Sequence, residues 1–267
     1  ARAGSAAGGA PGHGPARQVA LGDLAVTGGE VTAYTRSDGS FVIDAPQAPT
    51  LAASLVGRAA IVSNRAGADL TATASNQSGA TLTLGAATGA TALAQTTAYV
   101  YTTLARRFVE ANGIPGGRLG QALLTRVNLD ETCNAHYAPA DRSINFYRAG
   151  GGCNNTAEDS VIAHEYGHFI DDTFGGMTSD GLSEGWGDTV ACFLLQSPEG
   201  GAGFYSNGEE LRSCDNDYRY PASGRDEVHA LGQAWAGFAW HAREGLIRTL
   251  GEADGDARKN DHPRRLL

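Results

Sequence analysis

Residues 160–195 read SVIAHEYGHFIDDTFGGMTSDGLSEGWGDTVACFLL, and they hold the most specific pattern in the chain. His164 and His168 are four residues apart, so on a helix they lie on one face, one turn apart. Both imidazoles can then face one metal ion. Glu165 lies about 100° around the helix, where its carboxylate can reach a water beside that ion without binding the ion itself. The spacing predicts a water-activating zinc site.

A third ligand is needed, because two histidines are too few for a stable zinc site. Glu184 is the candidate, at the start of an apolar helix expected over residues 183–195. Asp188, four residues later on the same face, can accept a hydrogen bond from the far nitrogen of a ligating histidine. The alternative is that both acids only complement the helix N-terminus. Their coincidence with the histidine pair favours the metal site.

These residues resemble the gluzincin metallopeptidases, thermolysin-like and especially fungalysin-like. In that family HExxH precedes a glutamate-bearing helix, to which GLSEGWGD (181–188) is similar. The resemblance implies a zincin catalytic domain in which His164, His168 and Glu184 bind zinc. It also implies that Glu165 is the general base.

Two further stretches extend the resemblance over residues 94–243. CNAHYAPADRSINFY (133–147) is similar to the edge strand of these peptidases, which implies that Asn134 and Ala135 pair with the substrate backbone. DEVHALGQAWAGFAW (226–240) resembles the helix whose histidine faces the scissile carbonyl, which implies a catalytic role for His229. Asp226 or Glu227 is then close enough in sequence to keep that histidine protonated.

The chain departs from the family pattern in three places. The loop between His168 and Glu184 is shorter than in thermolysin, so it must be tighter. It contains no tyrosine, whereas thermolysin-like enzymes place an oxyanion-stabilising phenol there; Tyr218 or Tyr220 is the candidate replacement. Few residues follow Arg243, so the catalytic region is expected to be truncated at its C-terminal end.

Composition narrows the class of protein. The 267 residues are 42% hydrophobic, enough for a substantial core, and the net charge of −9 argues against a nucleic-acid binder. No apolar run approaches the roughly 18 residues of a membrane span. The start at Ala1 suggests a processed or excised piece, and the scarcity of lysine is typical of a GC-rich, bacterial genome.

Four cysteines, an even number, occur at spacings that do not match a zinc ribbon. Three disulfide connectivities are possible. We favour Cys133 with Cys153 and Cys192 with Cys214, because each pair closes a short loop beside the histidine region. Such bonds indicate an oxidising, extracellular compartment.

The chain is expected to contain three parts. Residues 1–16 are rich in Gly, Ala and Pro and predict a flexible linker or frayed terminus. Residues 17–93 contain short β-prone runs separated by turns, and residues 94–267 form the catalytic domain. Its helices are expected after Ala94, after a capping box at Thr156 and Asp159, and over 183–195 and 228–243. The predicted fold class is α+β: a thermolysin-like domain preceded by a small all-β segment.

The sequence therefore predicts a secreted zinc endopeptidase acting on a protein or peptide substrate, with no nucleic-acid partner and an undetermined oligomeric state. One alternative is an inactive zinc-binding extracellular module. Another is a disulfide-stapled adhesion or matrix fragment with a fortuitous HExxH. Asp215 and Asp217 suggest calcium weakly, because acidic loops are more often solvated. Trp235 and Phe238 lie on a helical stripe interpreted as core.

Overall fold

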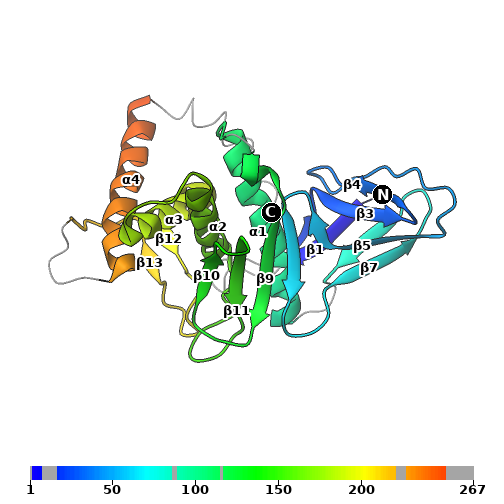
Figure 1. Ribbon diagram of the computed structural model, residues 1–267, viewed down its shortest axis with the longest axis horizontal. Coiled ribbons are helices and arrows are strands. Elements are labelled where there is room, and N and C mark those ends of the chain that lie inside the picture. Colours follow the sequence, from blue (N-terminus) through cyan, green and yellow to red (C-terminus); the bar gives the residue numbers. More distant parts are fainter. Residues whose placement is uncertain (1, 8–16, 86–88, 115–116, 221–226, 251–267) are drawn as a thin grey trace.

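The computed structural model describes residues 2–7, 17–85, 89–114, 117–220 and 227–250. The molecule is elongated, with a β-rich end and a helical end joined by a sheet (Figure 1). The predicted α+β class is confirmed. The helices are α1 (Ala90–Ala111), α2 (Asp159–Thr173), α3 (Asp180–Leu195) and α4 (Val228–Leu250), with a 3-10 turn, η1 (Gly117–Gly120).

The main sheet crosses the boundary expected near residue 93. Its strand order is β10-β11-β9-β6-β5-β3-β4, with β7 also paired to β5. Parallel pairing of β6 with β9 joins the two parts in one sheet. The β-rich segment is thus continuous with the sheet that carries the later strands. The strands are β3 (Leu24–Gly28), β4 (Val31–Tyr34), β5 (Thr50–Gly57), β6 (Ala60–Asn64), β7 (Thr71–Ser75), β9 (Leu123–Leu129), β10 (Ala135–Ala138) and β11 (Ser143–Tyr147).

A second sheet corrects the expectation for residues 1–16. β1 (Arg2–Ala7) is a strand, paired antiparallel with β2 (Arg17–Ala20) and parallel with β8 (Thr81–Leu84). A strand needs only backbone partners on its two sides, so small side chains do not prevent it. Residues 8–16 lie outside the described part of the chain. A two-stranded pair, β12 (Glu199–Gly200) with β13 (Arg212–Ser213), completes the strands.

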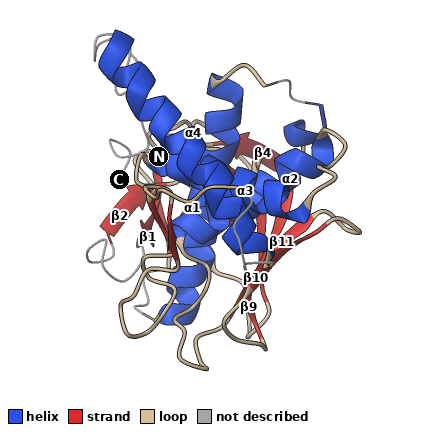
Figure 2. Ribbon diagram, turned by 90° about the vertical axis from the view of Figure 1, so that its left-hand side faces the viewer, coloured by secondary structure: helices blue, strands red, loops and turns tan. Residues whose placement is uncertain are grey.

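The helices lie together beside β9, β10 and β11 (Figure 2). α1 packs on β6 and β9, α2 on α1 and on β10 and β11, α3 on α2, and α4 on α3. Ile162 and Tyr166 anchor α2 in the core, at 0% and 1% exposure. On a helix of 3.6 residues per turn, His164 and His168 lie on the opposite face from these anchors. That face is the one that α3 covers.

Two details of the helices differ from the sequence prediction. Thr156 does not cap α2: its hydroxyl donates to the carbonyl of Asn134 and accepts the backbone N–H of Tyr147. The N-cap is Glu158, which makes no side-chain capping bond. Thr156 therefore ties the segment before α2 to the sheet, because Tyr147 at the end of β11 offers it a donor and Asn134, directly before β10, offers it an acceptor.

The stripe on α4 is not core. Trp235 is 39% and Phe238 is 65% exposed, whereas Ala236 and Trp240 are buried. The physical reason is the direction of packing: α4 meets α3 closely at Gly232, where an added Cβ would lie 2.6 Å from the backbone nitrogen of Gly185. This contact turns the side chain of Phe238 toward solvent.

Two disulfides have the favoured connectivity. Cys133–Cys153 ties the residues before β10 to the turn after β11, and Cys192–Cys214 ties the last turn of α3 to the residue after β13. Both bonds brace segments that surround the histidines.

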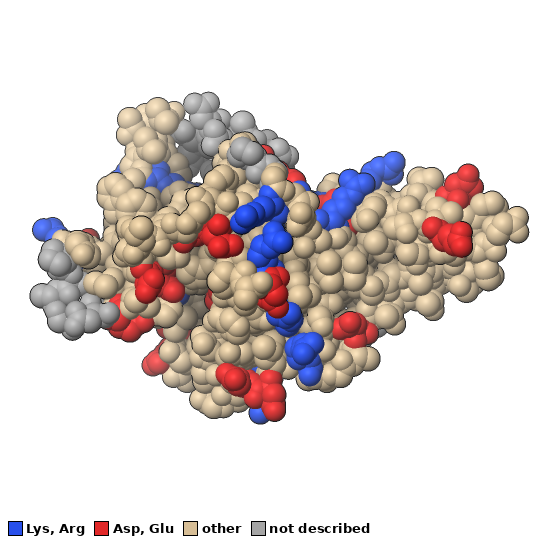
Figure 3. Space-filling view, viewed as in Figure 1, with Lys and Arg blue, Asp and Glu red and all other residues tan. Residues whose placement is uncertain are grey.

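The surface is charged but mixed. On the face shown in Figure 3, Lys and Arg form a band across the middle and acidic side chains lie on both sides of it. Within the described residues, every helix is too short or too polar to cross a bilayer.

Candidate metal centre

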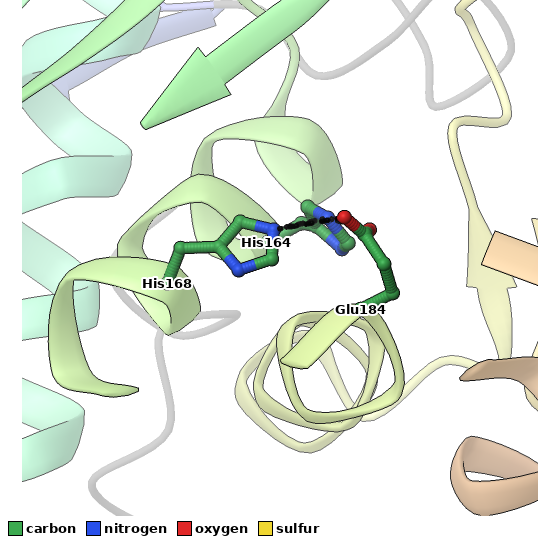
Figure 4. A group of neighbouring side chains, drawn as sticks. All are labelled: His164, His168 and Glu184. Carbon is green, nitrogen blue, oxygen red and sulfur yellow. Dashed lines mark hydrogen bonds and ion pairs between the residues drawn. The ribbon is translucent and has the colours of Figure 1, made fainter. Parts of the chain in front are cut away.

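His164, His168 and Glu184 converge on one point between α2 and α3 (Figure 4). Nε2 of His164 lies 3.1 Å from Nε2 of His168 and 3.1 Å from Oε2 of Glu184, and Nε2 of His168 lies 3.6 Å from Oε1 of Glu184. A tetrahedral zinc ion with ligands at about 2.0–2.1 Å separates its ligand atoms by about 3.3 Å. The donor set and its spacing therefore fit zinc.

The outer nitrogens of both imidazoles are held by hydrogen-bond partners. Nδ1 of His164 lies 2.9 Å from Oδ1 of Asp188, and Nδ1 of His168 lies 3.0 Å from Oγ of Ser183. These contacts leave both Nε2 atoms directed at the shared point. The structure brings Asp188 to His164, and it brings Ser183, which the sequence reasoning did not identify, to His168.

The electrostatics of the site favour a cation. Oε2 of Glu165 is buried without a hydrogen-bond partner. Burial opposes charge on His164, but hydrogen bonds with Asp188 and Glu184 raise its pKa to about 10. Burial also opposes ionisation of Glu184, yet His164 and His168 hold its pKa well below its usual range. The cluster carries excess negative charge that a proton or a metal ion can neutralise.

Zinc binding at pH 7 is expected to release about one proton from His164. Because the pKa of His164 is raised to about 10 in the metal-free protein, a proton competes with zinc at every pH below about 10. Zinc affinity should therefore rise with pH across this range. Titration calorimetry in two buffers of different ionisation enthalpy measures the released proton, and identical heats in both buffers would contradict this prediction.

Glycines set the distance between the two ligand-bearing helices. A Cβ added at Gly187 would lie 2.8 Å from the ring of His164, and one added at Gly167 would lie 2.8 Å from Cα of Gly187. Either contact is closer than real Cβ atoms come. Gly187 is therefore required for the imidazole of His164 to reach its place.

Replacing Gly187 with alanine is expected to displace the imidazole of His164 and to weaken zinc binding at least about tenfold. Overpacking of this kind also costs about 1–3 kcal/mol of stability. Zinc competition against a fluorescent chelator and thermal unfolding measure the two effects. Gly245→Ala is the control, because a Cβ there meets open space; equal affinities for the two variants would refute the steric requirement.

A cavity of about 350 Å³ opens beside the histidines. Glu165, which is 5% exposed, contributes to its wall, and so do Ala135 at the start of β10 and Asn134 directly before it. β10 pairs only with β11 among the described strands, so its other edge is free to pair with an extended chain. The structure brings the predicted base and the predicted substrate strand to one cavity.

His229, at the start of α4, reaches the same cluster. Its Nε2 lies 3.2 Å from Oε2 of Glu184, and its Nδ1 bonds Glu227. The side chain is 43% exposed and lines the cavity. Glu227 is one of the two acids expected to support it; Asp226 lies outside the described residues.

Arg212 is a cavity residue that the sequence reasoning missed. Its guanidinium bonds both carboxylate oxygens of Asp188, at 2.9 Å and 3.0 Å. Burial raises the pKa of Asp188, but Arg212 and His164 outweigh burial and lower it to about 2. Arg212 therefore keeps the partner of His164 ionised. No local pattern marks this residue, since it lies in a two-residue strand 24 positions after Asp188.

The candidate tyrosines do not reach the cavity. Tyr218 and Tyr220 are 45% and 79% exposed, and neither lines it. A different tyrosine, Tyr205, is among the residues that line it. The predicted replacements are thus wrong in position, because both side chains are exposed outside the cavity.

The structure gives no support to the calcium site that the sequence suggested at Asp215 and Asp217. Within the described part of the chain, His164, His168 and Glu184 form the one cluster of three metal-ligating side chains, and it includes neither Asp215 nor Asp217. Asp215 instead lies 3.7 Å from Nε2 of His241.

Two curated proteins from the fungus Arthroderma gypseum are similar in sequence. "Extracellular metalloproteinase 3" is 26% identical over 185 residues, which cover 57% of this chain and 29% of that protein. "Extracellular metalloproteinase 1" is 26% identical over 189 residues, covering 58% and 30%. This chain thus spans less than a third of the length of either relative. No protein-family model matches it.

These similarities support the resemblance to metallopeptidases in general terms. They do not support the bacterial source expected from the composition, because both relatives are fungal.

Proposed function

We propose that this protein is a secreted, zinc-dependent endopeptidase of the gluzincin type. The observation that carries the proposal is the convergence of His164, His168 and Glu184 beside a cavity lined by Glu165, whose buried carboxylate oxygen has no partner. The names of the two relatives support a metal-dependent extracellular peptidase. The two disulfides agree with an oxidising compartment.

His164, His168 and Glu184 would hold the zinc. When bound there, zinc supplies Lewis acidity, which lowers the pKa of a water and polarises a peptide carbonyl. Glu165 takes the proton of the attacking water and then delivers it to the leaving amine. With a hydrogen on each ring nitrogen, His229 donates Nδ1–H to Glu227 and can present Nε2–H to the oxygen that gains charge in the transition state.

The substrate would bind as an extra strand. The free edge of β10 supplies backbone donors and acceptors, with Asn134 and Ala135 nearest the cavity. Backbone pairing of this kind holds an extended peptide with little dependence on its sequence.

Casein hydrolysis with and without a chelator tests the proposal. The purified protein is expected to cleave casein, to lose this activity in 1,10-phenanthroline, and to regain it when zinc is added back. Activity unchanged by chelation would refute the proposal. One zinc per chain without hydrolysis would support the inactive binding module, and well under one zinc per chain after supplementation would support the adhesion or matrix fragment.

A further inference from the structure

The second histidine of the metal centre is backed by a chain of two hydrogen bonds. Nδ1 of His168 lies 3.0 Å from Oγ of Ser183, and this hydroxyl lies 2.7 Å from Oδ2 of Asp171. Asp171 is three residues after His168 on α2, so both side chains lie on one face of that helix. Ser183 reaches between them from α3, directly before Glu184.

The direction of the protons in this chain is fixed by chemistry. An ionised carboxylate can only accept hydrogen bonds, and a serine hydroxyl has one proton to give. The 2.7 Å separation is typical of a hydroxyl donating to a carboxylate. Once that proton points at Asp171, Oγ of Ser183 can only accept from His168. Nδ1 of His168 must then carry a hydrogen, and Nε2 keeps its lone pair for a metal.

The two histidines thus have different supports. His164 contacts the carboxylate of Asp188 directly, and Arg212 binds that carboxylate. His168 contacts a neutral hydroxyl, which by itself could turn either its hydrogen or its lone pair toward Nδ1. Only a partner that cannot donate removes this ambiguity, and Asp171 is that partner.

We propose that Ser183 and Asp171 are positioning residues that hold His168 in the tautomer and orientation required for zinc. We call the two hydrogen bonds that run from His168 through Ser183 to Asp171 the relay. The inference rests on the proposed metal centre. Asp171 acts solely through Ser183, because its carboxylate contacts the hydroxyl and not the imidazole. Partners of this kind generally change metal affinity by about 10- to 100-fold.

The test is zinc affinity, measured by competition with a fluorescent chelator, together with the visible absorption spectrum of the cobalt-substituted protein. Ser183→Ala should lower zinc affinity about 10- to 100-fold and change the cobalt spectrum. Ser183→Thr, which keeps the hydroxyl, should restore both. Asp171→Ala should lower the affinity less, because the freed hydroxyl can still accept from His168 part of the time.

The double variant provides the sharpest comparison. If Asp171 acts only through Ser183, then Asp171→Ala should cost nothing further in the Ser183→Ala background. Asp172→Ala is the matched control: it removes the same charge from the next residue, whose carboxylate bonds the hydroxyl of Tyr137 instead. Additive losses in the double variant, or an equal loss in the control, would overturn the relay.

The outcomes also separate the relay from the proposed activity. A wild-type protein that binds zinc but cleaves no peptide would refute only the activity, because every relay measurement is made on metal binding. A wild-type protein that binds no zinc would overturn the metal centre and the relay together.

Discussion

Replacing Glu165 with glutamine is expected to leave zinc bound and to lower kcat for peptide hydrolysis about 100- to 10,000-fold. The amide keeps the size of the side chain but cannot take a proton from water. Glu165 is not among the three converging ligands, so zinc affinity should stay within a few-fold of wild type. Steady-state kinetics on a quenched fluorescent peptide and zinc analysis after dialysis measure the two properties.

Glu209→Gln is the control for this comparison, because it makes the same chemical change at an exposed surface position. It should leave both zinc content and kcat unchanged. Wild-type turnover by the Glu165 variant would show that another group is the base. A parallel loss of zinc would instead show that Glu165 supports the metal.

Replacing Glu184 with glutamine is expected to remove zinc. A neutral amide is a weaker ligand than a carboxylate, and the two histidines alone do not complete a stable site. Because even the partners of ligands change affinity by about 10- to 100-fold, loss of a ligand should exceed about 100-fold. Zinc per chain after dialysis against a weak chelator should fall well below one, and activity should fall with it.

Asp180→Asn tests whether this loss is specific. It neutralises an exposed acid in the first turn of the same helix, so it changes the charge of α3 without touching the cluster. Zinc content should match the wild type. If the Glu184 variant keeps one tightly bound zinc, then the third ligand is a different residue.

Much of the candidate site could be predicted because its geometry is local. A helix places residues four apart on one face, so the pairs His164–His168 and Glu184–Asp188 follow from the sequence once α2 and α3 are recognised. The buried stripe of α2 is equally local: Ile162 and Tyr166 share a face, and that face meets the core.

Prediction failed where a position depends on segments that are distant in sequence. Arg212 lies beside Asp188 only because β13 folds back against α3, and Phe238 is exposed because α4 meets α3 at its glycine face. β1 forms because β2 and β8 supply backbone partners. None of these contacts produces a periodic pattern in the sequence.

The sequence by itself predicted three candidate zinc ligands and the face of each helix that they occupy, because helical spacing is a property of the backbone. Only the tertiary structure decided how the two faces meet. Gly167 and Gly187 let α2 and α3 approach until His164, His168 and Glu184 share one point. The same approach brings Ser183 between His168 and Asp171. Such contacts depend on the packing of whole helices, which no short stretch of sequence specifies.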